Sequence, residues 1–353
     1  MNKVGRFLLY PFSLLYGLVI STRNTLYDTG LLKETSFNLP VISVGNLSVG
    51  GAGKTPHVEY LLQLLQPYIH VSVLSRGYKR KTKGFKIVQR NDTALISGDE
   101  PLQFKGKFPN VPVAVSESRA LGIPQLIKNH PEIQAVLLDD AFQHRSVKPS
   151  LNILVTPLEN LYTEDMLLPA GRLREPAPAA GRADIIVVSK CNDSLSLEDS
   201  SEIIKKLNPL NHQRVYFTQY LYGTPYYIFN GKNKIQLHSE LNIILISAIA
   251  NTNYLKQYIH QNSKSINSME YEDHHNFSDR DMNYLLKVFK ESSKNNTAII
   301  TTEKDAIRLQ EHKEFIIEHN LPIFALPARV EFLFDQKISF DHQIKDFLKN
   351  YKV

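Results

Sequence analysis

The sequence predicts an α/β protein with a mainly parallel sheet flanked by helices, followed by a second, smaller α/β domain. Short apolar runs rich in β-branched residues alternate with helical segments along the chain. At 353 residues the chain is long for a single hydrophobic core. From Arg214 the composition becomes aromatic and β-prone, and a new series of strands and helices then begins. These observations favour two domains.

The first domain is organised around the stretch PVISVGNLSVGGAGKTPHVEY, residues 40–60. An apolar strand leads into a glycine-rich turn, and a helix begins at Lys54 and Thr55. Backbone N–H groups of such a turn converge on phosphate oxygens, and the positive end of the helix dipole adds to the attraction. Lys54 is expected to reach the β- and γ-phosphates of a nucleotide, and Thr55 to hold Mg²⁺. The predicted phosphate-binding loop (P-loop) comprises Ser48, Val49, Gly50, Gly51, Ala52, Gly53, Lys54 and Thr55, with Ser48 where the usual pattern has glycine.

Another apolar strand ends in two adjacent aspartates, in AVLLDDAFQHR at residues 135–145. A strand that ends in aspartate is the expected partner of a P-loop, because it brings a carboxylate to Mg²⁺ beside the threonine hydroxyl. Asp139 or Asp140 is therefore the candidate metal ligand. Gln143 and His144 follow closely, and their side chains could meet the same phosphates. The two motifs in this order predict a P-loop NTPase-like sheet that binds a nucleotide.

The composition favours anionic partners without choosing among them. The formal net charge of +6 suits phosphates, nucleic acid or a membrane surface. Nucleic acid is the weakest of these, because the basic run at 76–83 belongs to no recognisable nucleic-acid-binding module. Cys191 is the only cysteine, which excludes an internal disulfide and fits a reducing compartment such as the cytoplasm.

The N-terminal segment 3–20 is strongly apolar but contains Pro11. It is shorter than the roughly 20 apolar residues that span a bilayer, and no convincing signal-peptide cleavage site follows it. Two interpretations remain. Either the segment lies in a membrane interface, with Tyr10 and Tyr16 at headgroup depth and Arg23 near lipid phosphates, or it is a helix packed on the core.

Further segments lie where open α/β sheets place their ligand sites, at the carboxyl ends of strands. The strand 70–74 is followed by Arg76, the cation nearest to its end. The segment 167–182, LLPAGRLREPAPAAGR, is irregular and rich in proline, glycine and arginine, which is typical of an active-site loop. The strand 184–189 runs into SKCND, where Asn192 replaces the carboxylate that would read guanine, so ATP is favoured over GTP.

The second half of the chain predicts a smaller domain without a P-loop, joined through a β-hairpin-like aromatic linker. In its YEDHHNF segment, His274 and its neighbours could bind a metal, belong to an ordinary loop or orient a catalytic group. No spaced third ligand supports a metal there. TTEKD, where a strand ends and a helix begins, is also expected to face the cleft. The predicted division is a membrane-interface helix at 1–25, a P-loop domain at 26–213, a linker at 214–232 and the smaller domain at 233–353.

Taken together, these segments resemble one family, the lipid A 4′-kinases, also called tetraacyldisaccharide 4′-kinases. The matching segments follow the family's order from about residue 10 to about residue 330, and a P-loop led by serine or threonine is the family's own form. Two departures are Ala141, where the family usually has glycine, and Arg172, where proline is common. Neither removes a functional group. The matching segments are SVGNLSVGGAGKTP, LSRGY, GDEP, LLDDAFQHR, LLPAGRLREP, SAIAN, YEDHHNF and TTEKDA.

The resemblance implies transfer of the ATP γ-phosphoryl group to the 4′-hydroxyl of a tetraacylated glucosamine disaccharide 1-phosphate. The product would be lipid IVA, an intermediate of lipid A (lipopolysaccharide) biosynthesis. ATP and Mg²⁺ are implied, whereas nucleic acid and an obligate protein partner are not expected. Because the substrate's acyl chains stay in the bilayer, the resemblance also favours a peripheral protein whose N-terminal helix lies at the cytoplasmic face of the inner membrane.

The same resemblance assigns roles to individual residues. Asp99, in a segment SGDEP that is by itself an ordinary turn, would orient and deprotonate the sugar hydroxyl. His274 would hydrogen-bond Asp99 from the other domain, so the cleft must close for chemistry. The implied sets are Asp99, His274, Asp139 and Asp140 for catalysis; Thr55, Asp139 and Asp140 for Mg²⁺; the P-loop and Gln143 for the nucleotide; and Arg76, Glu100, His144 and Arg174 for the substrate.

Two other functions remain open. A small-molecule kinase or GTPase could use the same fold, with the N-terminal helix merely structural. A nucleotide-sensing membrane adaptor without catalysis is the other alternative, and it predicts that Asp99 and His274 can be replaced without loss of turnover.

Overall fold

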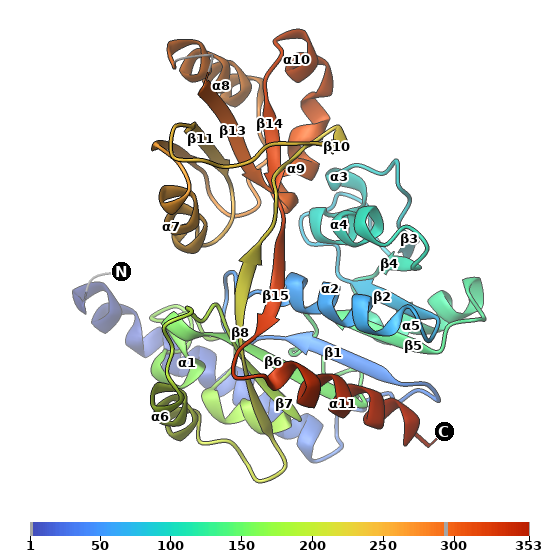
Figure 1. Cartoon of the computed structure of the whole chain (residues 1–353). Helices are drawn as coiled ribbons and strands as arrows, with labels where there is room; N and C mark the ends of the chain where they lie inside the picture. Colours follow the sequence, from blue (N-terminus) through green and yellow to red (C-terminus); the bar gives the residue numbers. More distant parts are fainter. Residues whose placement is uncertain (1–2, 293–295, 353) are drawn as a thin grey trace.

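The computed structural model describes residues 3–292 and 296–352 and contains two α/β domains, drawn one above the other in Figure 1. The larger domain is built on a nine-stranded sheet in the order β15-β8-β7-β6-β1-β5-β2-β4-β3. Its strands pair in parallel except at the two edges, where β3–β4 and β8–β15 are antiparallel. The strands are β1 (Val41–Gly45), β2 (Val71–Ser75), β3 (Lys86–Ile87), β4 (Val113–Val115), β5 (Ala135–Asp139), β6 (Leu151–Pro157), β7 (Ile185–Ser189), β8 (Arg214–Tyr222) and β15 (Ala328–Phe332).

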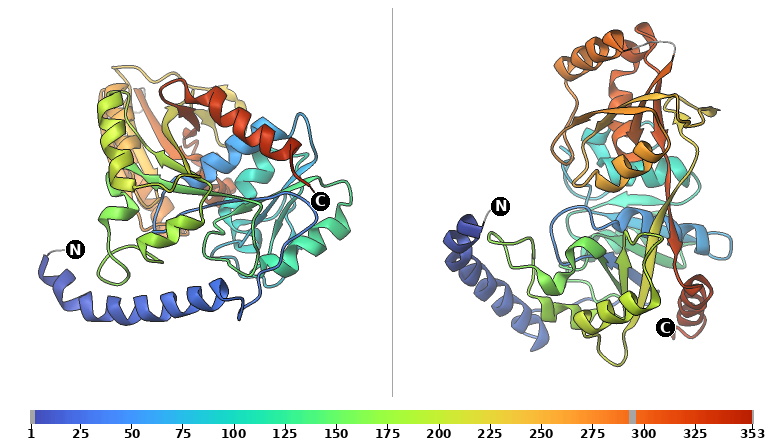
Figure 2. Two further views of the ribbon diagram at one scale, coloured as in Figure 1. Left: turned by 90° about the horizontal axis from the view of Figure 1, so that it is seen from below. Right: turned by 60° about the vertical axis from the view of Figure 1, so that its left-hand side comes forward.

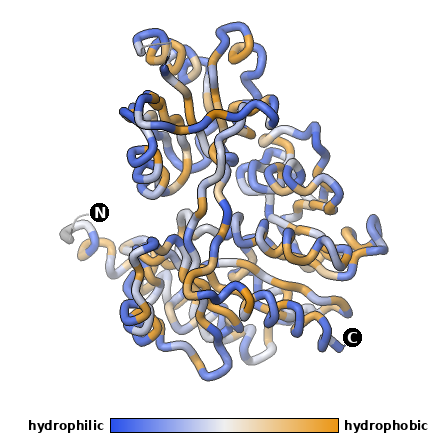
Figure 3. Tube along the Cα trace, viewed as in Figure 1, coloured by the Kyte–Doolittle hydropathy of each residue, from blue (hydrophilic) through white to orange (hydrophobic). Residues whose placement is uncertain are grey.

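The central strands of this sheet are covered on both faces. Strands β1, β2, β5 and β7 are buried at every position and apolar along most of their length (Figure 3), as expected for parallel strands between two helical layers. Alternate residues face opposite sides, so Ile42 packs under one layer and Val41 under the other. One layer contains α2 (Lys54–Leu65), α3 (Ala94–Ser97), α4 (Asp99–Lys107) and α11 (Gln336–Lys349), and the other contains α5 (Arg119–Asn129) and α6 (Leu197–Leu207).

The smaller domain has a six-stranded sheet in the order β10-β9-β14-β13-β11-β12. Helices α8, α9 and α10 pack on one face and α7 on the other. Helix α8 begins with a capping box between Ser278 and Asp281, which satisfies free N–H groups of its first turn. The strands are β9 (Tyr226–Tyr227), β10 (Asn230–Lys234), β11 (Asn242–Ser247), β12 (Ser265–Glu270), β13 (Thr297–Thr302) and β14 (Ile323–Leu326), and the helices are α7 (Asn253–Gln261), α8 (Asp279–Glu291), α9 (Glu303–Leu309) and α10 (Lys313–Glu318).

The two domains are joined by a pair of antiparallel strands rather than by one hairpin. Strand β8 pairs with β15, which follows about 100 residues later, from Ala328 opposite Tyr222 to Phe332 opposite Thr218 (Figure 1). Helix α11 then packs its Phe340 into the core of the larger domain. The last strand and helix therefore belong with the larger domain, which differs from the predicted limit of 233–353. The sequence did not indicate that the chain returns to the larger domain, because β15 directly follows β14, a strand of the smaller domain.

The N-terminal helix α1 (Lys3–Asp28) is longer than the apolar segment that predicted it and lies along one side of the larger domain (Figure 2). Its buried or half-buried stripe includes Ser13, Tyr16, Gly17 and Asn24, spaced at helical intervals. The opposite face is apolar and exposed. Among the described residues, no helix is both long and apolar enough to cross a membrane. The exposed apolar side chains are Phe7, Leu8, Tyr10, Phe12, Leu14, Leu15, Leu18 and Val19.

A buried ion network connects the two domains behind the cleft. The Nζ atom of Lys107, in the last turn of α4, lies 2.7 Å from Oε2 of Glu59 on α2 and 2.5 Å from Oε2 of Glu303 on α9. Gln103 donates to Glu59, and the hydroxyl of Tyr226 donates to Glu303. Burial raises the pKa of Glu59 to about 7 despite the nearby lysine. The positive charge of Lys107 therefore offsets the repulsion between two buried carboxylates.

Replacing Lys107 should destabilise the protein. We expect Lys107→Ala to lower the free energy of unfolding by about 3 kcal/mol in urea denaturation at pH 8, because two buried carboxylates lose their counter-ion. The loss should be smaller at pH 6, since protonation of Glu59 below its folded pKa relieves the repulsion. Lys206→Ala, at the exposed pair with Glu164, is the control and should leave stability unchanged. Equal effects of both substitutions would contradict this role of Lys107.

Candidate active site

The P-loop connects β1 to α2 at the carboxyl edge of the large sheet. Gly50 and Gly53 have positive φ angles of 103° and 89°, which side chains other than glycine rarely adopt. A Cβ atom on Gly53 would also lie 2.5 Å from the hydroxyl oxygen of Tyr220. Position 53 therefore requires glycine for two reasons: its backbone conformation is left-handed, and a side chain would collide with Tyr220. The predicted strand, turn and helix are all present.

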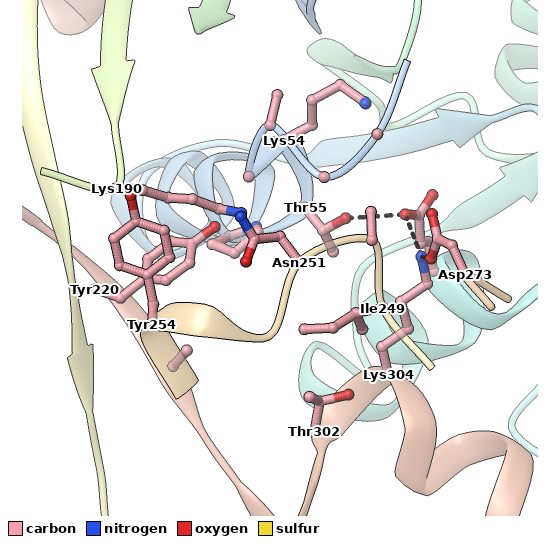
Figure 4. Close-up of a pocket in the computed structure, with 18 of the residues that line it drawn as sticks. Lys54, Thr55, Lys190, Tyr220, Ile249, Asn251, Tyr254, Asp273, Thr302 and Lys304 are labelled. Carbon is pink, nitrogen blue, oxygen red and sulfur yellow. Dashed lines mark hydrogen bonds and ion pairs between the residues drawn. The ribbon is translucent and has the colours of Figure 1, made fainter. Parts of the chain in front are cut away.

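A cavity of about 530 Å³ opens between this loop and the smaller domain. Figure 4 shows Thr55 near its middle, with Lys190, Tyr220 and Tyr254 on one side and Asp273 and Lys304 on the other. Both domains therefore contribute to one site. From the predicted set the cavity is lined by residues 48–55 of the P-loop, Glu100, Asp140, Arg174 and His274.

Asp99 and His274 meet at the junction of the domains. Within SGDEP, Ser97 ends α3 and Asp99 begins α4, where Pro101 is tolerated because it lies in the first helical turn. Asp99 is its first residue and is 5% exposed. The Oδ2 atom of Asp99 lies 2.9 Å from Nδ1 of His274, and Nζ of Lys304 lies 3.0 Å from Nε2 of the same ring. Because an ammonium group only donates, Nε2 is the acceptor and the protonated Nδ1 donates to Asp99.

The charge of Asp99 is stabilised by cations from the smaller domain. Burial favours its protonated form, but the charge of Lys304, the hydrogen bond from His274 and the charge of Arg308 hold its pKa well below the ordinary value. Arg308 Nη1 lies 3.3 Å from Asp99 Oδ2. Lys304 also lies 3.2 Å from Oε1 of Glu100, and these carboxylates keep its pKa raised against burial. Asp99 is therefore ionised at neutral pH.

A second cluster lies beside the P-loop and consists of Asp140, Lys54, Arg174 and Asn46. Asp140 Oδ1 accepts a hydrogen bond of 2.9 Å from Nη2 of Arg174 and lies 3.6 Å from Nζ of Lys54. Lys54 also donates to Oδ1 of Asn46, at 3.1 Å, and Arg174 donates to the same oxygen. Burial alone would raise the pKa of Asp140, but Lys54 and Arg174 hold it well below its usual range. Two cations and one carboxylate thus converge at the mouth of the loop.

Asp139 is buried completely and differs from its neighbour. Its Oδ2 accepts from the hydroxyl of Ser75 at 2.9 Å, whereas Oδ1 has no hydrogen-bond partner among the described residues. Burial, with smaller contributions from Glu100 and Asp140, raises its pKa to about 7. Within residues 3–292 and 296–352, no cluster of three or more histidine, cysteine, aspartate or glutamate side chains forms a metal site by itself.

Five predicted residues do not line the cavity: the buried Asp99 and Asp139, and also Arg76, Gln143 and His144. Gln143 donates to the carbonyl of Asn46, and His144 lies 3.4 Å from Nη1 of Arg119. Burial, and then the charges of Arg119 and Arg76, lower the pKa of His144 to about 4. Arg76 itself is exposed. Arg76 and Arg119 are thus close enough to His144 to act on its charge, and none of these three side chains lines the cavity.

The structure adds functional candidates that the sequence analysis did not select. Lys304 and Lys190 belong to the motifs TTEKD and SKCND. Lys190 directly follows β7 and Lys304 lies two residues after the end of β13, and this position near a strand end was the available signal. Lys190 lies over the ring of Tyr254, 5.6 Å from its centroid, and close to Gly51 of the P-loop. Burial lowers the pKa of Lys190 to about 8. Arg308 and the fully buried Arg119 had no such signal, because arginines within helices are usually solvated.

Comparison with known proteins gives a consistent result over the whole chain. Residues 5–349 match the family described as "Tetraacyldisaccharide-1-P 4'-kinase". A tetraacyldisaccharide 4′-kinase of Bacteroides thetaiotaomicron is 43% identical, with 97% of this chain and 93% of that protein aligned. The proteins of the same name from Flavobacterium johnsoniae and Porphyromonas gingivalis are 43% and 39% identical, each over 98% or more of both chains.

A solved structure has the same architecture. The crystal structure described as an "apo" form of LpxK from Aquifex aeolicus in complex with ATP is 31% identical in sequence. Its TM-score is 0.74, and the match covers 97% of this chain and 99% of that one. At this identity and coverage the likeness extends over both domains.

Lys190 should make nucleotide binding sensitive to pH. With a pKa of about 8, the Lys190 side chain is mostly protonated at pH 7, where it would attract an anionic nucleotide, and mostly neutral at pH 9. We expect the Kd for ATP, measured by calorimetry, to rise several-fold between these values. Lys190→Met should weaken binding about tenfold at pH 7 and remove this pH dependence. A pH dependence that persists in Lys190→Met would exclude Lys190 as its source.

Proposed function

Because this chain belongs to the tetraacyldisaccharide-1-phosphate 4′-kinase family, we propose that its interdomain cavity transfers the γ-phosphoryl group of ATP to a 4′-hydroxyl. The acceptor is a tetraacylated glucosamine disaccharide 1-phosphate, and the product is lipid IVA. One observation carries the proposed site: the buried Asp99–His274 pair, 2.9 Å apart, lies across the domain junction next to the P-loop.

In the proposed reaction the sugar 4′-oxygen forms a bond to the γ-phosphorus while the bond from that phosphorus to the bridging oxygen breaks. ADP leaves with the bridging oxygen, and the hydroxyl proton passes to Asp99. A carboxylate with a depressed pKa is a weak base, but the transition state of phosphoryl transfer is loose and the proton leaves late. Asp99 therefore acts chiefly by orienting the hydroxyl, and its low pKa keeps it available as an acceptor.

Cations of both domains neutralise charge on the transferring group. Lys54 and the P-loop amides hold the phosphates. Arg174 contacts Asp140 and Asn46, the same two residues that Lys54 contacts, so its guanidinium would bind the same phosphates. Lys304, paired with Glu100, reaches the cavity from the smaller domain. Since these cations are now paired with carboxylates, phosphate oxygens would replace carboxylate oxygens as their partners.

The residues present also fit Mg²⁺, which we assign to Thr55, Asp139 and Asp140. The buried Oδ1 of Asp139 has no hydrogen-bond partner among the described residues. The Thr55 hydroxyl lies 3.4 Å from Oε1 of Glu100, a carboxylate near enough to raise the pKa of Asp139. When bound, Mg²⁺ would neutralise charge on the β- and γ-phosphate oxygens.

We assign the substrate's polar head to Glu100, Arg174, Arg76 and His144. Glu100 and Arg174 line the cavity, whereas Arg76 and His144 lie outside its wall and close to each other. A disaccharide whose 4′-hydroxyl lies at Asp99 and whose 1-phosphate reaches Arg76 and His144 would contact both pairs of residues. His144 is neutral and Arg119 is fully buried, so Arg76 is the exposed charge of this group that would attract a phosphate.

We further assign α1 to the cytoplasmic face of the inner membrane. The apolar face of α1 is largely exposed, with Phe7 80%, Phe12 60% and Leu15 63% accessible, which suits burial among acyl chains. The hydroxyl of Tyr16, however, is directed at the protein and donates to the carbonyl of Arg174, so it does not act at headgroup depth as expected. The same helix would thus place the active site near the lipid substrate.

Asp99→Asn tests the proposed chemistry. Transfer from radiolabelled ATP to the detergent-dispersed disaccharide should fall by about a hundredfold or more, the usual scale for losing a general base. Asp346→Asn, an exposed aspartate on α11, is the matched control and should retain full activity. If wild-type protein binds ATP but labels no lipid, the nucleotide-sensing adaptor is the better explanation. Wild-type rates in Asp99→Asn would exclude Asp99 as the base.

Substitutions on the apolar face of α1 test the membrane assignment. The double variant Phe12→Ser, Leu15→Ser removes two apolar side chains, each worth about 1.5 kcal/mol or more when buried. Its partitioning onto vesicles of anionic phospholipid, measured by co-sedimentation, should fall by about a hundredfold. Ile338→Ser removes an equally exposed apolar side chain from α11 and should not change partitioning. Equal partitioning of both variants would contradict the assignment.

A further inference from the structure

The inner face of α1 is polar where helices packed on a protein are usually apolar. Ser13 donates to the carbonyl of Leu167 at 3.0 Å and accepts from the N–H of Ala170, and Asn24 donates to the buried Glu175 at 2.8 Å. A Cβ atom on Gly17 would lie 2.7 Å from a methyl carbon of Leu167, so the helix and the loop approach closely here. The helix is therefore held by directional hydrogen bonds to the loop that carries Arg174.

Two further polar contacts lead from α1 toward the P-loop. The hydroxyl of Tyr16 donates to the backbone carbonyl of Arg174 at 2.9 Å, and Nη2 of Arg23 donates to the carbonyl of Gln143 at 3.0 Å. Gln143 in turn donates to the carbonyl of Asn46, and Arg174 donates to that carbonyl and to the Asn46 side chain. Both routes thus end at Asn46.

Asn46 is the last step before the phosphate-binding lysine. Its Oδ1 accepts from Nζ of Lys54 at 3.1 Å, and its amide group donates to the carbonyl of Ser48 within the P-loop. The backbone of Arg174 is fixed on both sides, since its N–H donates to the carbonyl of Leu47 while its carbonyl accepts from Tyr16. Arg174 thus makes three hydrogen bonds to Asn46 and Leu47, the two residues directly before the P-loop, so a shift of Arg174 would be passed on to the loop.

From this connected set we infer that Tyr16 is a positioning residue for phosphoryl transfer: by holding the Arg174 backbone, it keeps the guanidinium between Asp140 and Asn46 and so supports Lys54. The inference rests on the proposed role of Arg174 at the phosphates. It gives α1 two functions on opposite faces. The apolar face meets the membrane, and the polar face completes the active site.

The geometry explains why one hydroxyl should matter. Tyr16 is half-buried, and its ring stays in place when the hydroxyl is removed, so Tyr16→Phe tests the hydrogen bond and not the packing. The carbonyl of Arg174 would lose this partner. The guanidinium could then move away from Asp140, leaving Lys54 with an altered set of partners in the transition state.

A double-mutant cycle between Tyr16 and Arg174 tests the inference. Wild type, Tyr16→Phe, Arg174→Ala and the double variant are assayed with detergent-dispersed lipid, so that membrane recruitment does not limit the rate. We expect Tyr16→Phe to lower kcat about three- to tenfold, the scale of one hydrogen bond, and to change the KM for the lipid less than twofold. In the Arg174→Ala background the same substitution should change kcat less than twofold. Tyr284→Phe, at an exposed tyrosine on α8, is the control.

The outcomes separate this inference from the proposed function. A full Tyr16→Phe effect in the Arg174→Ala background would overturn the inference, because Tyr16 would then act elsewhere. A raised KM for the lipid at unchanged kcat would overturn it in favour of a role in substrate capture alone. Unchanged kcat in Arg174→Ala would instead overturn the proposed role of Arg174 itself. A drop in kcat in Tyr16→Phe that disappears without Arg174 is the supporting result.

Discussion

The hydrogen bond between Asp99 and His274 is the interaction on which the arrangement of the site depends. Asp99 begins a helix of the larger domain, and His274 lies in a loop of the smaller one, so the pair exists only when the domains meet. Lys304 and Arg308 approach the same two residues from α9, which converts a single contact into a buried cluster of mixed charge. Removing a member would leave an uncompensated buried charge, so the cluster favours contact between the two domains.

Charge balance links this cluster to the P-loop. Cations of both domains, among them Lys54, Arg174 and Lys304, are each paired with a carboxylate at the edge of the cavity. Phosphate oxygens can replace those carboxylates without leaving any cation unpaired, so a nucleotide would enter a site whose donors are already oriented. Such preorganisation is the usual source of electrostatic catalysis in phosphoryl transfer.

The site has supports on two sides. Behind the cleft, Lys107 holds α2, α4 and α9 together through two glutamates. On the opposite side, α1 is tied through Tyr16 and Arg23 to the backbone of residues that contact Asn46. An apolar outer face and a polar inner face give this helix the reverse of the usual pattern, because its inner surface must satisfy backbone groups of an irregular loop.

The sequence by itself determined the parallel α/β class, the P-loop, the aspartate pair at a strand end and, through family resemblance, the partnership of Asp99 with His274. These features are local: glycine, lysine and threonine in a fixed order, or an apolar run ended by carboxylates, require particular backbone geometry wherever they occur. Only the tertiary structure decided that β15 and α11 return to the larger domain, that Lys304 and Lys190 reach the cavity and that Tyr16 faces Arg174. Each of these depends on contacts between residues distant in sequence, whose partners are selected by packing and charge compensation after the local elements have formed.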